Sequence, residues 1–522
     1  MNITVHTPSG VAVFSPDQPV LLSDLLSLHQ VPLAMPCGGR GKCKKCRVVA
    51  TGDLSPMGDL ERAALTAEEI AGDVRLACLV TVLGDATVTV GATAKTHVLL
   101  SGNLPPFPHN PIGKLYGFAV DIGTTTLAAY LYHLPSGTQL ATASMLNPQA
   151  TFGADVISRL QKSHEGQSAV IAASIRQALG KLVVELCQSA SICQAEIDSG
   201  AITGNTAMLY LLTEQPADSL IAVPFLPDRY FGEFVTPSSL DLDLDGCESI
   251  YLTRAMAAYV GGDITSSSMA AELHKKAPGD APCLLCDIGT NGEMVLFSHG
   301  KYFSCSTAAG PTFEGAGIHM GMTAKAGAIS KIAVEDGKFV YNIIGDVEAT
   351  GICGTGIIDG VAALLTLGVV DMTGRMVTEG HGFVEAITTV NDQPAFMLPG
   401  TQVIVTQADV RNVQMAKAAV CAGMLALLHV SNLDGQAIEL IIAGGFGSFI
   451  DPVSAERIGL IPKGFAVRAR AIGNAAGAGA CMALLSRDIL DESEAYSKTV
   501  TTLELSTDPC FMQEYVKNMM FI

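Results

Sequence analysis

A glycine- and threonine-rich loop between two apolar runs occurs twice in this chain. Loop 1, Asp-Ile-Gly-Thr-Thr-Thr at 121–126, follows Phe-Ala-Val and precedes Leu-Ala-Ala-Tyr-Leu. Loop 2, Asp-Ile-Gly-Thr-Asn-Gly-Glu at 287–293, begins 166 positions later, after Leu-Leu-Cys and before Met-Val-Leu-Phe. Each pattern predicts a strand, a tight turn and a second strand. Because one supersecondary unit returns at so long a spacing, we expect a duplicated pair of domains rather than a short-period array.

The composition of both loops suits phosphate binding. Glycine lets the backbone approach a ligand closely, and successive backbone N–H groups in a turn form an anion-binding nest. Threonine hydroxyls add donors, and the leading aspartate can hold Mg²⁺ directly or through water. An ordinary hairpin turn explains one such loop equally well, whereas two matching loops favour one nucleotide gripped from both sides.

A third glycine-rich segment supports a nucleotide site. An apolar strand pattern at 438–442 runs into Ala-Gly-Gly-Phe-Gly at 443–447, the glycine turn, where an adenine ring can lie on the backbone. Small residues at 473–480 are suited to close helix packing. With two helices expected near 259–270 and 473–484, these segments resemble, in the same order, the ATPase fold of actin, sugar kinases and Hsp70.

That resemblance implies roles for individual residues. Asp121 and Asp287 are expected to position Mg²⁺ and water, and Glu293 is a candidate base. A surface strand position explains Glu293 equally well. Asp263, at a predicted turn, is interpreted as a helix cap in preference to a metal-orienting carboxylate. The residues expected to bind the nucleotide are Gly123, Thr124, Thr125, Thr126, Gly289, Thr290, Asn291, Gly292, Gly444, Gly445 and Gly447.

The composition excludes some classes of partner. With 522 residues, 49 % of them hydrophobic, the chain can build several cores. A net charge of −19 and a pI near 4.9 argue against nucleic acid and anionic membranes as main partners. We find no signal peptide and no apolar span of about 20 residues, and the apolar run at 356–370 is expected to be a buried helix. A cytoplasmic protein with no membrane partner is therefore expected.

In the cytoplasm, the fourteen cysteines indicate metal ligands or buried thiols rather than disulfides. Cys283 and Cys286 have the spacing of a redox motif. They lie in a predicted strand, however, where side chains three positions apart face opposite ways, so we interpret both as core residues.

Four cysteines near the N-terminus predict an iron–sulfur module. Cys37, Cys43 and Cys46 have the spacing C-x5-C-x2-C, and Cys78 follows 32 residues after Cys46. The pattern resembles that of [2Fe–2S] ferredoxins, with the first gap one residue longer than in the plant type, as in adrenodoxin-like ferredoxins. Glycines 38, 39 and 41 would let the loop wrap a cluster. A zinc site or free thiols are the alternatives, although zinc ligands more often come as paired short knuckles.

Basic residues surround these cysteines in an otherwise acidic chain. Positive charge would stabilise a reduced cluster and could receive an acidic electron donor, while a solvated loop is the simpler interpretation. The residues are Arg40, Lys42, Lys44, Lys45 and Arg47.

The predicted fold is a multidomain chain of α/β and α+β type. A β-grasp, ferredoxin-like domain is expected at 1–95, followed by a proline-rich, semi-rigid linker at 96–115. A duplicated RNase H-like ATPase body follows, with its first lobe at 116–275 and its second at 276–522.

A ferredoxin module joined to this ATPase body resembles one family, the reductive activators of corrinoid proteins. The shared motifs are the cysteine set, loops 1 and 2, the glycine turn, Asn-Pro-Gln at 147–149, Gly-Asn-Thr at 204–206 and Gly-Pro-Thr-Phe-Glu-Gly at 310–315. The resemblance implies an ATP- and Mg²⁺-dependent enzyme with a [2Fe–2S] cluster on Cys37, Cys43, Cys46 and Cys78. It would pass one electron to Co(II) of a corrinoid protein and so restore Co(I) for methyl transfer.

The implied partners are a corrinoid protein of a methyltransferase system and an electron-donor protein, and the family suggests a homodimer. Two other functions stay open. An ATP-gated donor to another low-potential enzyme, like the dehydratase activators, would share a cluster between subunits, whereas here four cysteines lie in one module. An ATP-binding redox sensor or assembly protein would show no ATP turnover stimulated by a corrinoid protein.

Overall fold

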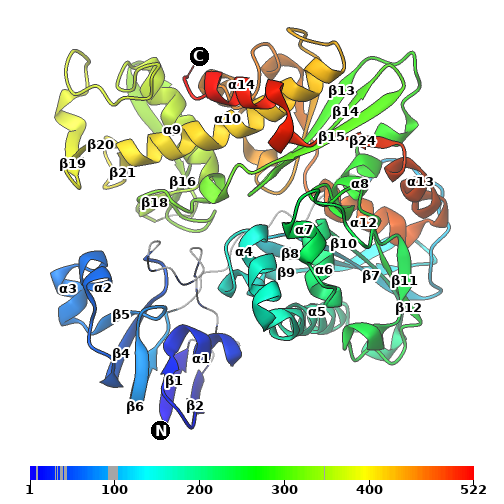
Figure 1. Cartoon of the computed structure of the whole chain (residues 1–522), viewed down its shortest axis with the longest axis horizontal. Coiled ribbons are helices and arrows are strands. Elements are labelled where there is room, and N and C mark those ends of the chain that lie inside the picture. The colour runs from blue at the N-terminus through cyan, green and yellow to red at the C-terminus, as the bar shows by residue number, and fades with distance from the viewer. Residues whose placement is uncertain are drawn as a thin grey trace.

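The computed structural model arranges the chain as three large sheets with helices packed on them (Figure 1). The residues that it describes are 1–7, 10–29, 31, 33, 35, 39, 41, 44–91, 104–345 and 347–521. The first part of the expected linker, residues 96–103, lies outside them. In Figure 1 the N-terminal sheet (blue) lies beside the first lobe (cyan to green) and below the second lobe (green to red).

The N-terminal sheet is mixed. Its elements are β1 (Ile3–Thr7), β2 (Gly10–Phe14), β3 (Val20–Leu21), α1 (Leu22–Leu28), β4 (Arg47–Leu54), α2 (Asp59–Ala64), α3 (Ala67–Ala71), β5 (Val74–Leu76) and β6 (Thr81–Thr89). The strand order is β2-β1-β6-β4-β5, with β3 also on β6. The central β1 and β6 are parallel, and the other neighbours are antiparallel. Leu22, Leu25 and Leu26 of α1 are buried in the core of this sheet.

The first lobe is built on a sheet of order β11-β12-β10-β7-β8-β9. Its strands are β7 (Tyr116–Ile122), β8 (Thr126–His133), β9 (Thr138–Leu146), β10 (Ile197–Gly204), β11 (Glu233–Val235) and β12 (Ser249–Leu252). Its helices are α4 (Val156–Lys162), α5 (Ser168–Ala190), α6 (Thr206–Thr213), α7 (Asp218–Ile221) and α8 (Gly262–Ala270). Loop 1 joins β7 to β8, as predicted.

The second lobe contains a sheet of order β23-β22-β13-β14-β15-β24. Its strands are β13 (Cys283–Ile288), β14 (Gly292–Ser298), β15 (Lys301–Thr307), β22 (Glu439–Ala443), β23 (Ala469–Ala471) and β24 (Val500–Thr502). The helices are α9 (Gly354–Thr366), α10 (Gln407–Val430), α11 (Pro452–Ile458), α12 (Ala475–Leu485), α13 (Arg487–Ser497) and α14 (Pro509–Lys517). Two small sheets complete the lobe: β16 (Ala328–Glu335), β17 (Lys338–Ile343) and β18 (Gly351–Ile352), and then β19 (Ile387–Val390), β20 (Gln393–Met397) and β21 (Ile404–Thr406).

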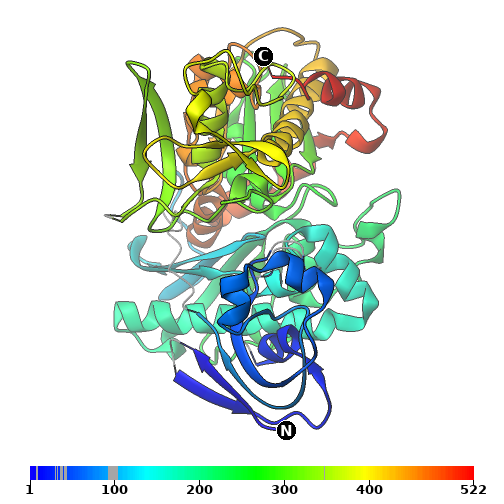
Figure 2. The same cartoon turned by 90° about the vertical axis from the view of Figure 1, so that its left-hand side faces the viewer.

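The two lobes repeat one arrangement, which confirms the duplication inferred from loops 1 and 2. In the first lobe, the antiparallel strands β9-β8-β7 continue into β10 and β12, both parallel to β7. In the second, the antiparallel strands β15-β14-β13 continue into β22 and β23, both parallel to β13. Each loop therefore occupies the same position in its own sheet, and Figure 2 shows the two lobes one above the other.

Helix α12 is shared between the lobes. Met482 belongs to the same core as Phe297 of the second-lobe sheet and Ile264 of α8. Leu484 packs instead with Ala119 and Tyr130 of the first-lobe sheet. One helix thus contributes to cores on both sides of the junction, and its contact with α8 fixes how the lobes meet.

Two other expectations about the core are confirmed. Cys283 and Cys286 are fully buried and lie in different cores on the two faces of their sheet. The apolar run after residue 354 forms the buried helix α9. Among the described helices, α10 alone is long and apolar enough to cross a membrane, and 78 % of its most apolar window is buried inside the protein.

The contact between α8 and α12 yields a first prediction. A Cβ at Gly479 of α12 would lie 2.1 Å from the carbonyl oxygen of Ser266 in α8. Gly479→Ala should therefore push the helices apart and lower stability by about 1–3 kcal/mol, measured as a fall in the thermal midpoint by circular dichroism. Gly180→Ala in α5 is the matched control, because a Cβ there meets nothing within 4 Å and should be neutral or stabilising by up to about 1 kcal/mol. Equal midpoints for both variants would contradict the close packing.

Candidate functional site

Loops 1 and 2 are joined by a single carboxylate. The Thr125 hydroxyl in loop 1 donates to one oxygen of Glu314, and the Thr290 hydroxyl in loop 2 donates to the other at 2.5 Å. Glu314 ends a short 3-10 helix, Pro311–Glu314, that follows β15. The two loops predicted to face each other therefore do so.

Buried polar side chains hold the backbone of loop 1. The amide of Asn147 donates to the Gly123 carbonyl at 2.8 Å, and the amide of Asn205 donates to the Thr124 hydroxyl at 3.2 Å. The guanidinium of Arg159, fully buried, donates to the Thr124 carbonyl at 2.6 Å. Burial lowers the pKa of Arg159 to about 10, while the negative charges of Glu314 and Asp155 raise it.

Four carboxyl groups gather where the lobes meet. This acidic cluster consists of Asp121 at the end of β7, Asp263 in the first turn of α8, Asp287 at the end of β13 and Glu293 at the start of β14. Desolvation raises the pKa of Asp121 to about 7, of Asp287 to about 6 and of Asp263 to about 8. Burial, with the charges of Asp263 and Asp287, raises the pKa of Glu293 well above its ordinary value. The site therefore favours bound protons or a cation.

The structure decides between the alternative interpretations of Asp263 and Glu293. The cap of α8 is Gly261 and no side chain caps the helix, so the interpretation of Asp263 as a cap was wrong. Its carboxylate instead accepts the neighbouring Ile264 N–H and faces the other acids. Glu293 is 8 % exposed, which rules out a surface position. Its carboxylate accepts a hydrogen bond from the Asn291 amide at 3.2 Å.

The glycine turn lies against loop 2. Ala443, the last residue of β22, pairs with Asp287, and Gly444 follows with φ +91°. A Cβ at Gly444 would lie 2.4 Å from a carboxylate oxygen of Asp287, so only glycine fits here. The Gly444 N–H donates to the Gly473 carbonyl just before α12. The third predicted nucleotide segment and the N-terminus of α12 thus adjoin loop 2.

Sequence reasoning missed several residues of this site. Glu314 lies in the shared motif at 310–315 but received no role there, Arg159 was not singled out, and Asn474 was noted only within a run of small residues. A hydrogen bond from the Asn474 side chain partly opposes the rise in the pKa of Asp121. A charged residue set among glycines and apolar residues, as in Phe-Glu-Gly at 313–315, is the signal that could have pointed to Glu314.

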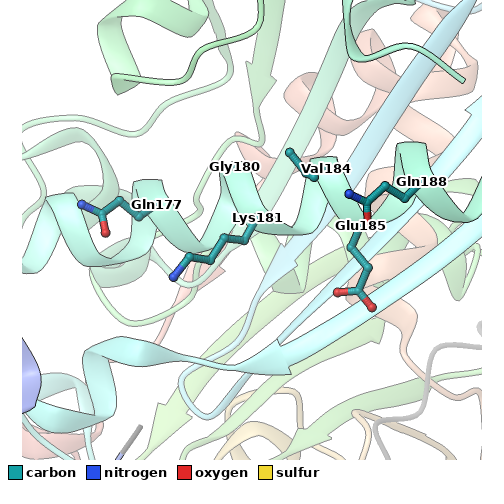
Figure 3. A pocket seen from close by; sticks show the side chains of 6 residues that line it. All are labelled: Gln177, Gly180, Lys181, Val184, Glu185 and Gln188. Atoms are coloured by element: carbon teal, nitrogen blue, oxygen red, sulfur yellow. The ribbon is translucent and has the colours of Figure 1, made fainter. Parts of the chain in front are cut away.

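A shallow hollow elsewhere on the protein does not belong to this site. It has a volume of about 690 Å³ and lies along the outer face of α5 (Figure 3). All of its lining residues come from that one helix: Gln177, Gly180, Lys181, Val184, Glu185 and Gln188. None of them is in loop 1, loop 2, the glycine turn or the acidic cluster.

The N-terminal sheet brings two of the predicted cluster cysteines together. The sulfur atoms of Cys46 and Cys78 lie 3.3 Å apart, and both side chains are buried. A disulfide would need about 2.05 Å, so the two sulfurs are adjacent without being bonded. The Ala77 N–H donates to the Cys46 carbonyl at 2.9 Å and fixes the two segments together. Cys37 and Cys43 lie outside the described residues, among which no group of three or more His, Cys, Asp or Glu is arranged to hold a metal.

Two glycines of the cysteine loop have the conformation that a tight wrap requires. Gly39 and Gly41 have φ +82° and +70°. A Cβ at Gly39 would lie 4.0 Å from the Cβ of Cys78, and one at Gly41 would lie 2.9 Å from the side chain of Leu79. Gly39 and Gly41 therefore lie close to the Cys78 segment, whereas Gly38 lies outside the described residues.

The basic residues around the cysteines have different surroundings. The Lys45 ammonium group donates to the Gly321 carbonyl of the second lobe at 2.8 Å. Arg47 pairs with Glu69 at 2.7 Å and also donates to the Lys44 carbonyl. Lys45 and Arg47 are thus held by the protein and are not part of a purely solvated loop. Arg40 and Lys42 lie outside the described residues.

A buried ion pair supports the Cys78 segment and gives a second prediction. Arg75 donates twice to Glu61, both at 2.9 Å, and the Leu76 N–H donates to the same carboxylate at 2.7 Å. Glu61→Ala would leave the buried guanidinium uncompensated, a change that costs about 3–5 kcal/mol. Hydrogen exchange at the Leu76 and Ala77 amides should then accelerate. Exposed Glu68→Ala is the control, and unchanged exchange in the Glu61 variant would contradict the role of the pair.

The acidic cluster gives a third prediction, about pH. The raised pKa values of Asp121, Asp263 and Asp287 mean that the folded protein holds these protons more tightly than the unfolded chain does. Between about pH 4 and 8 the free energy of unfolding should therefore fall as pH rises, by up to about 1.4 kcal/mol per pH unit for each retained proton. Thermal midpoints measured in EDTA at constant ionic strength test this.

Other groups also titrate over this range, so the comparison with a variant is decisive. Asp263→Asn cannot ionise and should flatten the decline relative to the wild type. Identical slopes for the two proteins would show that burial of Asp263 does not govern its charge.

Comparisons with known proteins agree with this architecture. Residues 281–522 match the family model described as the C-terminal domain of RACo, the ASKHA domain, and residues 116–276 match the RACo middle region. The chain is 36 % identical over 451 residues to the corrinoid activation enzyme RamQ of Eubacterium limosum, a match that covers 82 % of this chain and 74 % of RamQ. It is 24 % identical over 441 residues to the Co(II) methylated amine-specific corrinoid protein reductase of Methanosarcina barkeri, covering 77 % and 76 %.

A solved structure extends the likeness to the whole chain. It is that of a reductive activator for a corrinoid, iron–sulfur protein, which superposes with a TM-score of 0.70 at 27 % identity and covers 99 % of this chain and 98 % of its own. The similarity therefore includes the N-terminal sheet as well as both lobes. This chain belongs to the RACo family of corrinoid-activating enzymes.

Proposed function

We propose that this protein is an ATP-dependent reductive activator of a corrinoid protein in a methyltransferase system. It returns the substrate cobalt from Co(II) to Co(I), the state that accepts a methyl group. The observation that carries the proposal is that one chain combines a buried pair of adjacent cysteines, with sulfur atoms 3.3 Å apart, with two facing glycine–threonine loops. A cysteine pair can occur without such loops, and the loops can occur without the cysteine pair. A reduction driven by a nucleotide requires both.

The N-terminal domain, residues 1–95, is proposed to be a β-grasp ferredoxin-like domain that holds a [2Fe–2S] cluster on Cys37, Cys43, Cys46 and Cys78. The side chains of Cys46 and Cys78 fit this role because they are adjacent and buried. When bound, the cluster supplies the single electron that reduces Co(II) to Co(I), and an electron-donor protein restores it. The ion pair of Glu61 and Arg75 holds the backbone that presents Cys78.

The two lobes, residues 116–275 and 276–522, are proposed to bind Mg·ATP between them. The carboxylates of Asp121 and Asp287 hold the cation and orient water, and the acidic cluster gains from a cation because a nearby positive charge favours its ionised form. Glu293 is the candidate base: a carboxylate whose pKa is raised takes a proton from water more readily. The phosphates are held by Gly123, Thr124, Thr125, Thr126, Gly289, Thr290, Asn291 and Gly292, and adenosine by Gly444, Gly445 and Gly447.

ATP is needed because transfer of the electron from the cluster to Co(II) is thermodynamically unfavourable. Plant-type [2Fe–2S] centres have potentials near about −400 mV, and Co(I) corrinoids are stronger reductants. Each further 59 mV of unfavourable gap lowers the yield of product by roughly tenfold. A ligand can shift such an equilibrium only through different affinities for two conformations, and closure of the two lobes around a nucleotide supplies them.

Further features of the proposal concern the setting of the protein. We place it in the cytoplasm, where a cytoplasmic donor reduces it, and we expect it to act as a homodimer. Exposed Lys44 offers a positive charge to an acidic donor near the cluster. Neither nucleic acid nor a membrane takes part.

The test is anaerobic visible spectroscopy of a Co(II) corrinoid protein mixed with this protein, a reductant and ATP. Co(I) should accumulate only when ATP is present. Asp287→Asn should retain the cluster absorption but lower the rate of Co(I) formation by at least roughly a hundredfold, the order expected for loss of one positioned catalytic group. Wild-type activation in the Asp287 variant would refute the assigned role.

Cysteine variants check the other half of the proposal. Cys46→Ser should lose the cluster absorption and the activation while still binding Mg·ADP in calorimetry. Cys193→Ser, at an exposed cysteine, is the matched control and should behave as wild type. Wild-type protein that stays colourless after reconstitution would rule out the cluster.

A further inference from the structure

Glu314 occupies a position that a phosphate group would also suit. Each of its carboxylate oxygens accepts a hydroxyl proton, one from Thr125 and one from Thr290. These hydroxyls belong to the two loops proposed to hold phosphates. Hydrogen bonds to an ionised acceptor are roughly twice as strong as neutral ones, so the carboxylate competes directly with any other anion for the same donors.

The residue next to Glu314 is firmly seated. Phe313 is fully buried, and its ring stacks on Phe446 of the glycine turn with centroids 5.8 Å apart. Its carbonyl oxygen lies very close to Gly354, at the start of α9. A Cβ at Gly354 would lie 1.6 Å from that oxygen. The segment that carries Glu314 therefore touches loop 1, loop 2 and the glycine turn at once.

The same segment reaches the N-terminal domain. Residues 310–322, the connecting segment, fold back on themselves: a Cβ at Gly321 would lie 2.1 Å from the Gly315 carbonyl oxygen. Gly321 in turn accepts the hydrogen bond from Lys45 at 2.8 Å, and Lys45 immediately precedes Cys46. Close packing of Gly315 and Gly321, followed by this hydrogen bond, thus connects the segment of Glu314 to Lys45 beside Cys46.

We infer that Glu314 is a positioning residue that acts as an internal anion. It bridges the two loops when no nucleotide is bound, the phosphates of a nucleotide displace it, and the displacement alters the contact between Gly321 and Lys45. Nucleotide binding in the lobes is thereby coupled to the cysteine loop through residues 310–322. The inference rests on the proposed nucleotide site and adds how that site is regulated.

Calorimetry with a non-hydrolysable ATP analogue and Mg²⁺ tests the first step. Glu314→Gln and Glu314→Ala remove the competing charge and should each tighten binding roughly tenfold, the equivalent of the net worth of hydrogen bonds to a charged group. A residue needed only for structure, for holding Mg²⁺ or for hydrolysis would instead give weaker or unchanged binding when replaced. Exposed Glu335→Gln is the control for loss of one negative charge on the same lobe and should leave binding unchanged.

A double-mutant cycle tests the transmission. Lys45→Ala should tighten analogue binding roughly threefold in the wild-type background, because the bridged state loses one supporting hydrogen bond. In the Glu314→Ala background the same change should have no effect, since the bridge is already absent. Lys44→Ala, at the neighbouring exposed lysine, should leave binding unchanged in both backgrounds.

The outcomes separate this inference from the proposed function. Tight analogue binding by the wild type, with no gain in the Glu314 variants, removes the internal-anion role and leaves the ATP site intact. Additive effects of Lys45 and Glu314 remove the transmission. A wild-type protein that binds no nucleotide removes the proposed function and this inference together.

Discussion

The structure depends on four carboxyl groups that are removed from water at the junction of the two lobes. Asp121, Asp263, Asp287 and Glu293 come from a strand end, a helix start, and the two strands around loop 2. Burial makes ionisation of each one costly, and neighbouring carboxylates add to that cost for Asp121, Asp263 and Glu293. Such a cluster is stabilised when its acids are protonated or when a positive charge lies close to it. A site with two such states is suited to the binding of Mg·nucleotide proposed above.

The shared helix α12 couples this site to the packing of both lobes. Because its residues belong to cores on both sides of the junction, a change at the acidic cluster cannot be absorbed by one lobe alone. Gly479 lies so close to Ser266 that α8 and α12 are packed backbone to backbone, and such packed interiors deform poorly. The Tyr130 hydroxyl, which accepts from Asn474 at 3.2 Å, links the start of α12 to the first-lobe sheet. Closure of the lobes is therefore the natural response to a ligand held by both loops.

The sequence revealed those parts of the site whose signals are local. Loops 1 and 2 were found because turn chemistry and flanking strands lie next to each other in the chain, and Cys283 and Cys286 were assigned to opposite faces by the two-residue period of a strand. Asp263 was misjudged because a glycine pair followed by aspartate gives the same local signal for a helix cap as for a carboxylate aimed into a site. Glu314 and Arg159 were missed because their partners lie 189 and 35 positions away, and no periodic pattern marks a single polar contact.

The contact between the N-terminal domain and the second lobe has a strength that suits an electron carrier. The hydrogen bond from Lys45 to Gly321 is partly exposed, and a bond of this kind contributes a net of about 0.5–1.5 kcal/mol. Taken alone, this hydrogen bond is enough to bias the position of the domain but too little to hold it permanently. The cluster proposed above would have to meet a donor and then a corrinoid protein, and a rigidly docked domain would serve a single partner. Under the proposed function, a nucleotide would therefore influence electron transfer most directly by changing this weak contact, and not by changing the buried thiols themselves.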